Sequence, residues 1–394
     1  MNINININIK MINISPPPLQ SSNSPSISLD GSDESQMPVA AATVTASAAP
    51  NPASCLEQGQ SGVVSSTTPA HSNARNLESD MTVADSWTIW RPAVFWCILL
   101  SMSVILEGFS NLLLPQFYAI PVFCQTFGVV DLDGKYEIPT AWQAGLTIGC
   151  LGGEVAGLCM SAIAVERFGY RQTIIISLLI LVAFNNILFF AHSLWMLLIG
   201  EILCGIPFGV FQTLSCTYAS DVCPMKLRPF LTTYTNMCWL IGQLLSSGVL
   251  RILVGGSNQW VFRIPFALQW LCPIPLAIAV YFAPESPWWL VRHGLEKDAK
   301  KALARLSSSK NAPSSFKVDD CLKMIIATNE TERDLADGAG FKDCFGNANR
   351  RRTEISCITW IIQTMCGSAL MGYSTYFFVQ AGLNTQMAFN MSLG

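Results

Sequence analysis

Apolar stretches of about 20 residues, the length that a helix needs to cross a bilayer, recur from Trp90 onward between short polar breaks. A bilayer offers the backbone no hydrogen-bond partners, and a helix satisfies its own within one segment. The sequence therefore predicts an all-α integral membrane protein. The seven predicted spans are 93–114, 142–163, 173–191, 195–219, 231–250, 262–283 and 355–378, and residues 385–394 begin a partial eighth.

The composition argues against a water-soluble enzyme. Hydrophobic residues make up 51% of the 394 residues and charged residues only 12%, whereas soluble domains carry about a quarter charged residues. The net charge of −3 gives no basic excess for binding nucleic acid. No catalytic constellation or phosphate-binding glycine loop is recognisable. We expect neither an enzyme nor a cofactor.

The cysteines and histidines form no pattern of ligands. The chain has 14 cysteines, most of them inside apolar stretches and none in a CxxC pair, and its three histidines are isolated from one another. Disulfide frameworks and zinc sites both need recognisable cysteine or histidine spacings. We expect no metal site.

The first 88 residues are predicted to be a disordered cytoplasmic tail, because they are rich in Ser, Pro, Ala and Asn and lack sustained apolar periodicity. They show no secretory signal peptide. With the tail inside, the breaks at 164–172, 220–230 and 284–354 are also cytoplasmic, and they hold 17 of the 23 Lys and Arg residues. This positive-inside bias supports the orientation.

The spans fall into two groups. Residues 89–283 are expected to form a six-helix bundle, 284–354 a cytoplasmic loop, and 355–394 the start of a second bundle. Within the loop, apolar residues from Leu290 to Leu306 share one face and lysines the other. We expect an amphipathic helix on the membrane surface, with a solvated linker helix as the alternative. Arg350, Arg351 and Arg352 precede the seventh span as a topological anchor.

Three acids lie inside predicted spans: Glu107, Glu154 and Glu201. An ionisable residue in the bilayer is costly and is a functional hypothesis by default. A glutamate that alternates between dry and wet surroundings can take up and release a proton, as a proton symporter requires. Since Glu154 and Glu201 are flanked by glycines, hydrogen-bonded packing between close helices is the alternative for both.

Charged residues also gather at the cytoplasmic boundary. Glu166, Arg167 and Arg171 surround a tight turn at Gly169, and Asp221 and Arg228 flank the next cytoplasmic turn. Asp221 and Arg228 are expected to form an ion pair, because partial desolvation at the headgroup boundary strengthens ion pairs. Such pairs can hold one conformation closed. A purely topological role of these charges is the alternative.

Five sequence blocks then occur in order and at matching membrane depth. They are ERFGYR at 166–171, GEILCGIP at 200–207, YASD at 218–221 followed by Arg228, PESPWWL at 284–290, and GYSTYFF at 372–378. With these blocks the chain resembles fungal alpha-glucoside (maltose-type) permeases, in the sugar porter branch of the major facilitator superfamily. The resemblance runs from about Trp90 to the last residue.

The resemblance implies a major facilitator fold and proton-linked uptake of alpha-glucosides such as maltose, with sugar and protons as partners. It also implies closure of the cytoplasmic side by Glu285 with Glu166, Arg167, Arg171, Asp221 and Arg228. Among the three intramembrane acids, Glu107 is the expected proton-coupling residue. The family pattern EGYDT is EGFSN at 107–111, so Ser110 stands where the family has an aspartate that is expected to take part in proton coupling, and uncoupled or altered transport is the alternative.

Sugar recognition needs amide and hydroxyl partners for each buried sugar hydroxyl. Gln243 matches the family's sugar-contacting glutamine of the fifth span. Gln363, Tyr373 and Tyr376 match the seventh-span positions less closely, and Ala369 replaces a family asparagine.

Major facilitator proteins pair two six-helix bundles, whereas seven spans are found here. We expect a C-terminally truncated permease, which would be incomplete as a transporter. A non-transporting sugar sensor or a decayed permease remnant is the alternative. The resemblance points to the plasma membrane, with the lipid bilayer as surroundings.

Overall fold

The computed structural model describes residues 82–130, 134–256, 258–308, 317–336 and 345–393. These residues are almost entirely helical, which agrees with the predicted all-α class. The described strands are β1 (Val129–Val130) and β2 (Tyr136–Glu137), which pair antiparallel with Val129 opposite Glu137. The predicted disordered tail lies outside the described residues up to position 81. Its last residues differ from the prediction, because α4 (Val83–Ile89) is a helix with Thr82 as its N-cap.

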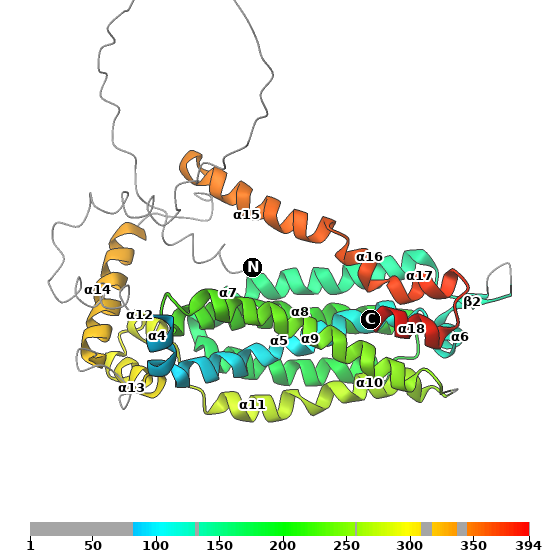
Figure 1. The fold of residues 1–394 in the computed structure, drawn as a ribbon, viewed down its shortest axis with the longest axis horizontal. Helices are drawn as coiled ribbons and strands as arrows, with labels where there is room; N and C mark the ends of the chain where they lie inside the picture. The colour runs from blue at the N-terminus through cyan, green and yellow to red at the C-terminus, as the bar shows by residue number, and fades with distance from the viewer. Residues whose placement is uncertain (1–81, 131–133, 257, 309–316, 337–344, 394) are drawn as a thin grey trace, which may run out of the picture.

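Five helical segments of the described chain are long and apolar enough to cross a membrane. They are α5 (Arg91–Phe117), α7 (Thr140–Phe189), α8 (Leu194–Val222), α9 (Arg228–Leu253), and α10 (Trp260–Leu271) continued by α11 (Pro273–Tyr281). Figure 1 shows them lying side by side along the long axis of the molecule. They coincide with the first six predicted spans, because α7 contains two of them.

The two spans within α7 meet at Gly169. Its φ of 81° and ψ of 172° are not helical, and a positive φ is a conformation that only glycine adopts readily. A Cβ here would also lie 2.9 Å from a carboxylate oxygen of Glu285. The tight turn predicted at Gly169 is therefore confirmed, and it divides α7 into segments 140–168 and 170–189.

Glycines let the long helices approach one another closely. A Cβ on Gly153 or Gly157 of α7 would collide with the carbonyl oxygens of Ile202 and Ile206 on α8. Gly108 of α5 and Gly242 of α9 are in similar backbone contact across a second crossing. Small residues four apart are a common means of packing membrane helices, since lipid provides no hydrophobic force between them. The close packing predicted around Glu154 is confirmed.

The short elements gather at the two ends of the bundle (Figure 1). One end carries α4, α12 (Pro287–Arg292), α13 (Glu296–Leu306) and α14 (Val318–Ala336), and it is the end predicted to be cytoplasmic. The opposite end carries α6 (Pro121–Phe127), β1, β2, α17 (Ser374–Gln380) and α18 (Thr385–Leu393). We call this opposite end the outer end.

The predicted amphipathic helix differs from the expectation in two respects. The apolar stretch is not one helix, because Gly294, with φ of 74°, separates α12 from α13. The apolar face of α13 is also covered by protein, since Ala299 and Leu303 are buried in a cluster with residues of α12 and α14. Lipid therefore does not need to cover that face.

The seventh span is wrong as a continuous helix. The helix α15 begins inside the predicted loop and runs over Asn347–Met365, followed by α16 (Ser368–Gly372) and then α17. Gly367 adopts a left-handed conformation with φ of 97°, which ends α15 and redirects the chain. The predicted partial eighth span corresponds to α18.

Candidate functional site

Glu107 lies in the middle of α5 with only 1% of its surface exposed. Gln212 of α8 donates a hydrogen bond from Nε2 to Oε1 of Glu107, at 3.2 Å. The other carboxylate oxygen, Oε2, is buried and has no hydrogen-bond partner among the described residues. An unsatisfied buried carboxylate oxygen carries a large desolvation cost. Glu107 is thus a buried carboxyl group with a single described hydrogen-bond donor.

The other two predicted acids lie on neighbouring helices. Asn111 of α5 donates to Oε1 of Glu154 at 3.0 Å, and the Cys150 thiol donates to Asn111 Oδ1 at 3.6 Å. Glu201 of α8 is 3% exposed. Within the described ranges, no lysine, arginine or histidine nitrogen lies within 4.0 Å of any of the three carboxylates. The bundle interior thus holds three acids without a cationic partner.

Ser110, which stands where the resembling family has an aspartate, takes part in a buried hydrogen bond. Ser110 Oγ accepts a hydrogen bond from Nε2 of Gln269 on α10 at 3.2 Å, and both side chains are buried. A neutral hydrogen bond therefore joins α5 to α10 where the resemblance leads one to expect a carboxylate. Sequence reasoning missed Gln269, although a polar amide inside the sixth span was a visible signal.

Among the four predicted sugar-binding residues, Gln243, Tyr373 and Tyr376 have described side chains, and no hydrogen bond joins these three to one another. Gln243 is half-buried on α9. The hydroxyl of Tyr373 hydrogen-bonds Thr147 of α7 at 2.8 Å, and its ring stacks on Tyr118 with centroids 6.2 Å apart. The hydroxyl of Tyr376 accepts a hydrogen bond from Gln380 at 3.2 Å. Gln363 belongs to α15, but its side chain lies outside the described residues.

Contacts at the outer end connect α17 and α18 to the first six spans. Gln380 Nε2 donates to Oε1 of Glu137 on β2 at 2.8 Å. Arg251, near the end of α9, donates to Oδ1 of Asn390 on α18. Together with the stacked rings of Tyr118 and Tyr373, these contacts join the first six spans to the residues that follow α15 at this end. Sequence reasoning missed Glu137, Arg251 and Asn390, because each is an ordinary polar residue near a helix or strand end.

At the opposite end, the carboxylate of Glu285 caps the second segment of α7. The backbone N–H groups of Tyr170 and Arg171 donate to it at 2.8 and 3.3 Å. A negative charge at a helix N-terminus satisfies free N–H groups and opposes the positive end of the helix dipole. Burial raises the pKa of the Glu285 carboxyl, and the backbone donors only partly offset this.

Asp221 joins three elements at the same end. Its Oδ2 accepts hydrogen bonds from the hydroxyls of Tyr170, at 2.8 Å, and Ser286, at 3.2 Å. Arg292 of α12 lies 4.0 Å from Asp221 and 4.0 Å from Glu166. Sequence reasoning missed Arg292, which follows the PESPWWL block by two residues.

The expected ion pair between Asp221 and Arg228 is wrong. Arg228 Nε instead donates to the Cys223 carbonyl oxygen at 3.2 Å, because Arg228 begins α9 and its side chain reaches back over the turn. Arg171 donates to the Tyr281 carbonyl oxygen at 3.5 Å and lies over the Tyr281 ring. In the part of the chain that the structure describes, Arg167 makes no ion pair within 4.0 Å.

The described residues contain no group of three or more histidine, cysteine, aspartate or glutamate side chains that could hold a metal ion.

The fold is that of the major facilitator superfamily. The structure of the proton:xylose symporter XylE, from E. coli, bound to 6-bromo-6-deoxy-D-glucose matches with a TM-score of 0.60 and 18% identity, over 77% of this chain and 66% of that one. A double tryptophan mutant of XylE matches with a TM-score of 0.57 and 18% identity, over 79% and 66%. At this identity the likeness shows the fold alone.

The family follows from the sequence comparisons. The profile described as "Sugar (and other) transporter" matches residues 96–394, and the chain belongs to this family. The general alpha-glucoside permease of Saccharomyces cerevisiae is 44% identical over 323 residues, 81% of this chain and 52% of that protein. The maltose permease MAL31 of the same species is 41% identical over 327 residues, 81% and 53%. The chain therefore spans about half the length of the curated relatives it matches.

These findings confirm the resemblance to alpha-glucoside permeases. Both relatives are named as permeases rather than enzymes, in line with the class expected from the composition. The chain is accordingly a multi-pass membrane protein of the sugar transporter family.

Proposed function

We propose that the protein transports alpha-glucosides such as maltose across a membrane together with protons, by alternating access between two helix bundles. Its family membership and its 41–44% identity to alpha-glucoside and maltose permeases support the substrate class. The observation that carries the proton part is Glu107, a buried carboxylate inside a membrane span with one neutral hydrogen-bond donor and one unpartnered oxygen.

Glu107 is the proton-coupling residue in this proposal. Charged groups inside a membrane face the bundle interior and commonly mark proton pathways. Glu107 takes up a proton when its site opens to water on one side and releases it on the other. Ser110, one turn further along α5, forms a neutral hydrogen bond with Gln269, so Glu107 carries the coupling in this proposal without a carboxylate at position 110.

Sugar binding is assigned to Gln243, Gln363, Tyr373 and Tyr376. Their amide and hydroxyl groups can replace the water partners of sugar hydroxyls, which is what a dehydrated binding site requires. Tyr373 also contacts Thr147 and Tyr118 at the outer end. Release of those contacts when the outer end opens would free its hydroxyl for substrate.

Alternating access requires closures at both ends of the path. The contacts of Glu137 with Gln380 and of Arg251 with Asn390 support a closure at the outer end. At the other end, the closing role is proposed for Glu166, Arg167, Arg171, Asp221, Arg228 and Glu285, together with Arg292. We further propose that the protein lies in the plasma membrane with its N-terminus in the cytoplasm, as the positive-inside bias indicates.

The test uses yeast cells that lack their own alpha-glucoside permeases. Two proteins are expressed with fluorescent tags: the 394-residue chain, and the same chain joined after Gly394 to the remaining residues of the general alpha-glucoside permease. We expect the joined protein to reach the plasma membrane, to take up labelled maltose, and to make the medium more alkaline as protons enter with the sugar. A joined protein that reaches the cell surface and takes up no alpha-glucoside would contradict the proposal.

Maltose binding by the 394-residue chain separates transport from sensing. If the 394-residue chain binds maltose and neither protein takes maltose up, the result would favour a sugar sensor. The relatives favour transport, because they are named as permeases.

A further inference from the structure

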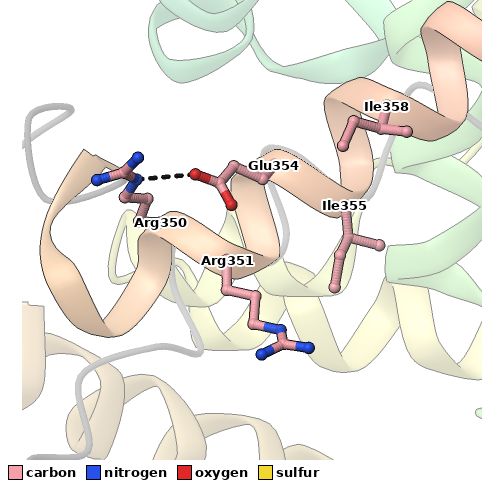
Figure 2. A pocket seen from close by; sticks show the side chains of 5 residues that line it. All are labelled: Arg350, Arg351, Glu354, Ile355 and Ile358. Atoms are coloured by element: carbon pink, nitrogen blue, oxygen red, sulfur yellow. Dashed lines mark hydrogen bonds and ion pairs between the residues drawn. The ribbon is translucent and has the colours of Figure 1, made fainter.

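A shallow and widely open pocket of about 480 Å³ lies against one face of α15 near its N-terminal end. Arg350, Arg351, Glu354, Ile355 and Ile358 line it, and all five come from this one helix (Figure 2). The pocket therefore combines cationic and apolar side chains on a surface of the protein that no other described element lines.

The charges of this pocket are unbalanced. Arg350 Nε pairs with Oε1 of Glu354 at 2.8 Å, which neutralises one guanidinium. Arg351 has no carboxylate within 4.0 Å in the described ranges. Its charge lies in the second turn of α15, close to the positive end of the helix dipole, where cations are disfavoured. An anion bound at Arg351 would relieve this repulsion.

The apolar part of the pocket follows Arg351 along one face. Ile355 and Ile358 come four and seven residues after Arg351, the spacing of side chains that share a helix face. They are 57% and 54% exposed, and Ile362, four residues further on, is 62% exposed. Exposed apolar side chains of a membrane helix are covered by acyl chains or by another helix, and the adjacent arginines favour a lipid with an anionic headgroup on this face.

We propose that this pocket binds an anionic phospholipid. The phosphate accepts hydrogen bonds from the guanidinium group of Arg351 and from the N–H groups of Arg350 that do not pair with Glu354. One acyl chain lies along Ile355, Ile358 and Ile362. Guanidinium groups suit phosphate because they present several donors in one plane. A free phosphate would leave the isoleucines exposed, whereas a lipid satisfies both parts. The assignment stands independently of the proposed sugar transport.

Arg352 provides a matched control within the same run of arginines. It is exposed, follows Arg351 directly, and does not line the pocket. A diffuse attraction between basic residues and an anionic membrane would treat Arg351 and Arg352 alike, at about 1 kcal/mol for each residue near the surface. At a defined site, replacing Arg351 would weaken lipid binding, whereas replacing Arg352 would not.

The experiment measures lipid retention by native mass spectrometry. The full chain is purified in detergent and titrated with phosphatidylserine, phosphatidylcholine or inorganic phosphate. We expect retention of phosphatidylserine in preference to phosphatidylcholine, and about a tenfold loss of that retention in Arg351→Gln, the order of one charge-assisted hydrogen bond. Arg352→Gln is expected to retain phosphatidylserine as the unaltered chain does.

A second variant tests the apolar part. Ile358→Ser is expected to weaken retention of phosphatidylserine while the guanidinium groups stay in place. Equal losses in Arg351→Gln and Arg352→Gln, equal retention of the two lipids, or displacement of the lipid by millimolar inorganic phosphate would each overturn the proposal. Matching thermal transitions of the variants show that the losses do not come from unfolding.

Discussion

At the scale of single residues, Glu285 links the turn at Gly169 to the segment before α12. Its carboxylate accepts backbone hydrogen bonds from Tyr170 and Arg171, while the side chain of Arg171 turns away to the Tyr281 carbonyl oxygen. Backbone N–H groups are present whatever the side chain, so this contact depends on the conformation at Gly169 rather than on a neighbouring charge. Glu285 thereby connects the loop after the sixth span to the start of the third.

The pH dependence of stability should report on Glu285. Burial raises the pKa of this carboxyl in the folded chain. The unfolded chain gives up the proton near the ordinary value of about 4.3. Since the folded state holds the proton to higher pH, the contribution of Glu285 to the free energy of unfolding falls as pH rises from about 4.3 through the raised pKa. Glu285→Gln removes this part of the pH dependence.

Thermal unfolding in detergent across that range measures the effect. We expect the stability advantage of the unaltered chain over Glu285→Gln to be largest near pH 4 and to shrink as pH rises. Glu296→Gln, at an exposed position at the start of α13, is the control and is expected to change little. A difference between the unaltered chain and Glu285→Gln that stays constant with pH would contradict the assignment.

Glu107 gives the residue-scale prediction for transport. In the joined protein, Glu107→Gln keeps the shape and the hydrogen bond from Gln212 but cannot carry a proton. A positioned proton-transfer group commonly contributes roughly a hundredfold to a rate. We expect proton-linked maltose uptake to fall by about that factor, while maltose binding changes much less. Unchanged alkalinisation of the medium during uptake would exclude Glu107 as the coupling residue, and Glu296→Gln again serves as the control.

At the scale of elements, glycine contacts decide how α7 crosses α8. Gly153 and Gly157 on α7 face backbone carbonyls of α8, and Gly205 and Gly209 on α8 face backbone atoms of α7 in return. Carbonyl oxygens of a helix cannot move aside as flexible side chains can. The crossing that positions Glu154 near Asn111 therefore tolerates no side chain at these places.

Adjacent glycines give a matched pair of variants for this crossing. A Cβ at Gly153 would collide with the Ile202 carbonyl oxygen, whereas a Cβ at Gly152 meets nothing within 4 Å. We expect Gly153→Ala to lower the free energy of unfolding by about 1–3 kcal/mol, the usual cost of overpacking. Gly152→Ala is expected to be neutral or to stabilise by up to about 1 kcal/mol through helix propensity. Thermal unfolding in detergent measures both, and equal effects would contradict the packing described here.

At the scale of the whole molecule, the two ends of the bundle differ in chemistry. The end with α12, α13 and α14 is formed by the long polar loop 284–354, which holds 13 of the 23 Lys and Arg residues. The outer end carries β1, β2 and the contacts of Glu137 and Arg251 with the residues after α15. This asymmetry is the whole-molecule basis of the proposed orientation.

Epitope tags in intact cells test that orientation. We expect a tag before residue 1 or between α13 and α14 to be reached by antibody only after permeabilisation. A tag between β1 and β2 should be reached without it. The reason is the cost of moving Lys and Arg residues across the membrane during insertion. The reverse pattern of access would show that the N-terminus lies outside.

Much of the fold was predictable because it depends on local properties of the sequence. Apolar length gave the first six spans within a few residues, and the turn at Gly169 was visible from the residue itself. The pairing of Asp221 with Arg292 was not predictable from the sequence. Arg228 is close to Asp221 along the chain, whereas Arg292 becomes close only when α12 folds against α7. The same holds for the contacts of Tyr373 with Thr147 and of Ser110 with Gln269, which join residues far apart along the chain.

The sequence by itself determined that this chain is a membrane protein of the sugar transporter family, because hydropathy and short motifs are read one segment at a time. The tertiary structure alone decided three further features: that α12 and α14 cover the apolar face of α13, that the seventh span breaks at Gly367, and that α17 and α18 contact the outer end of the bundle. Each of these depends on which surfaces meet after folding, and such meetings are set by the packing of the whole bundle rather than by the pattern of any one segment.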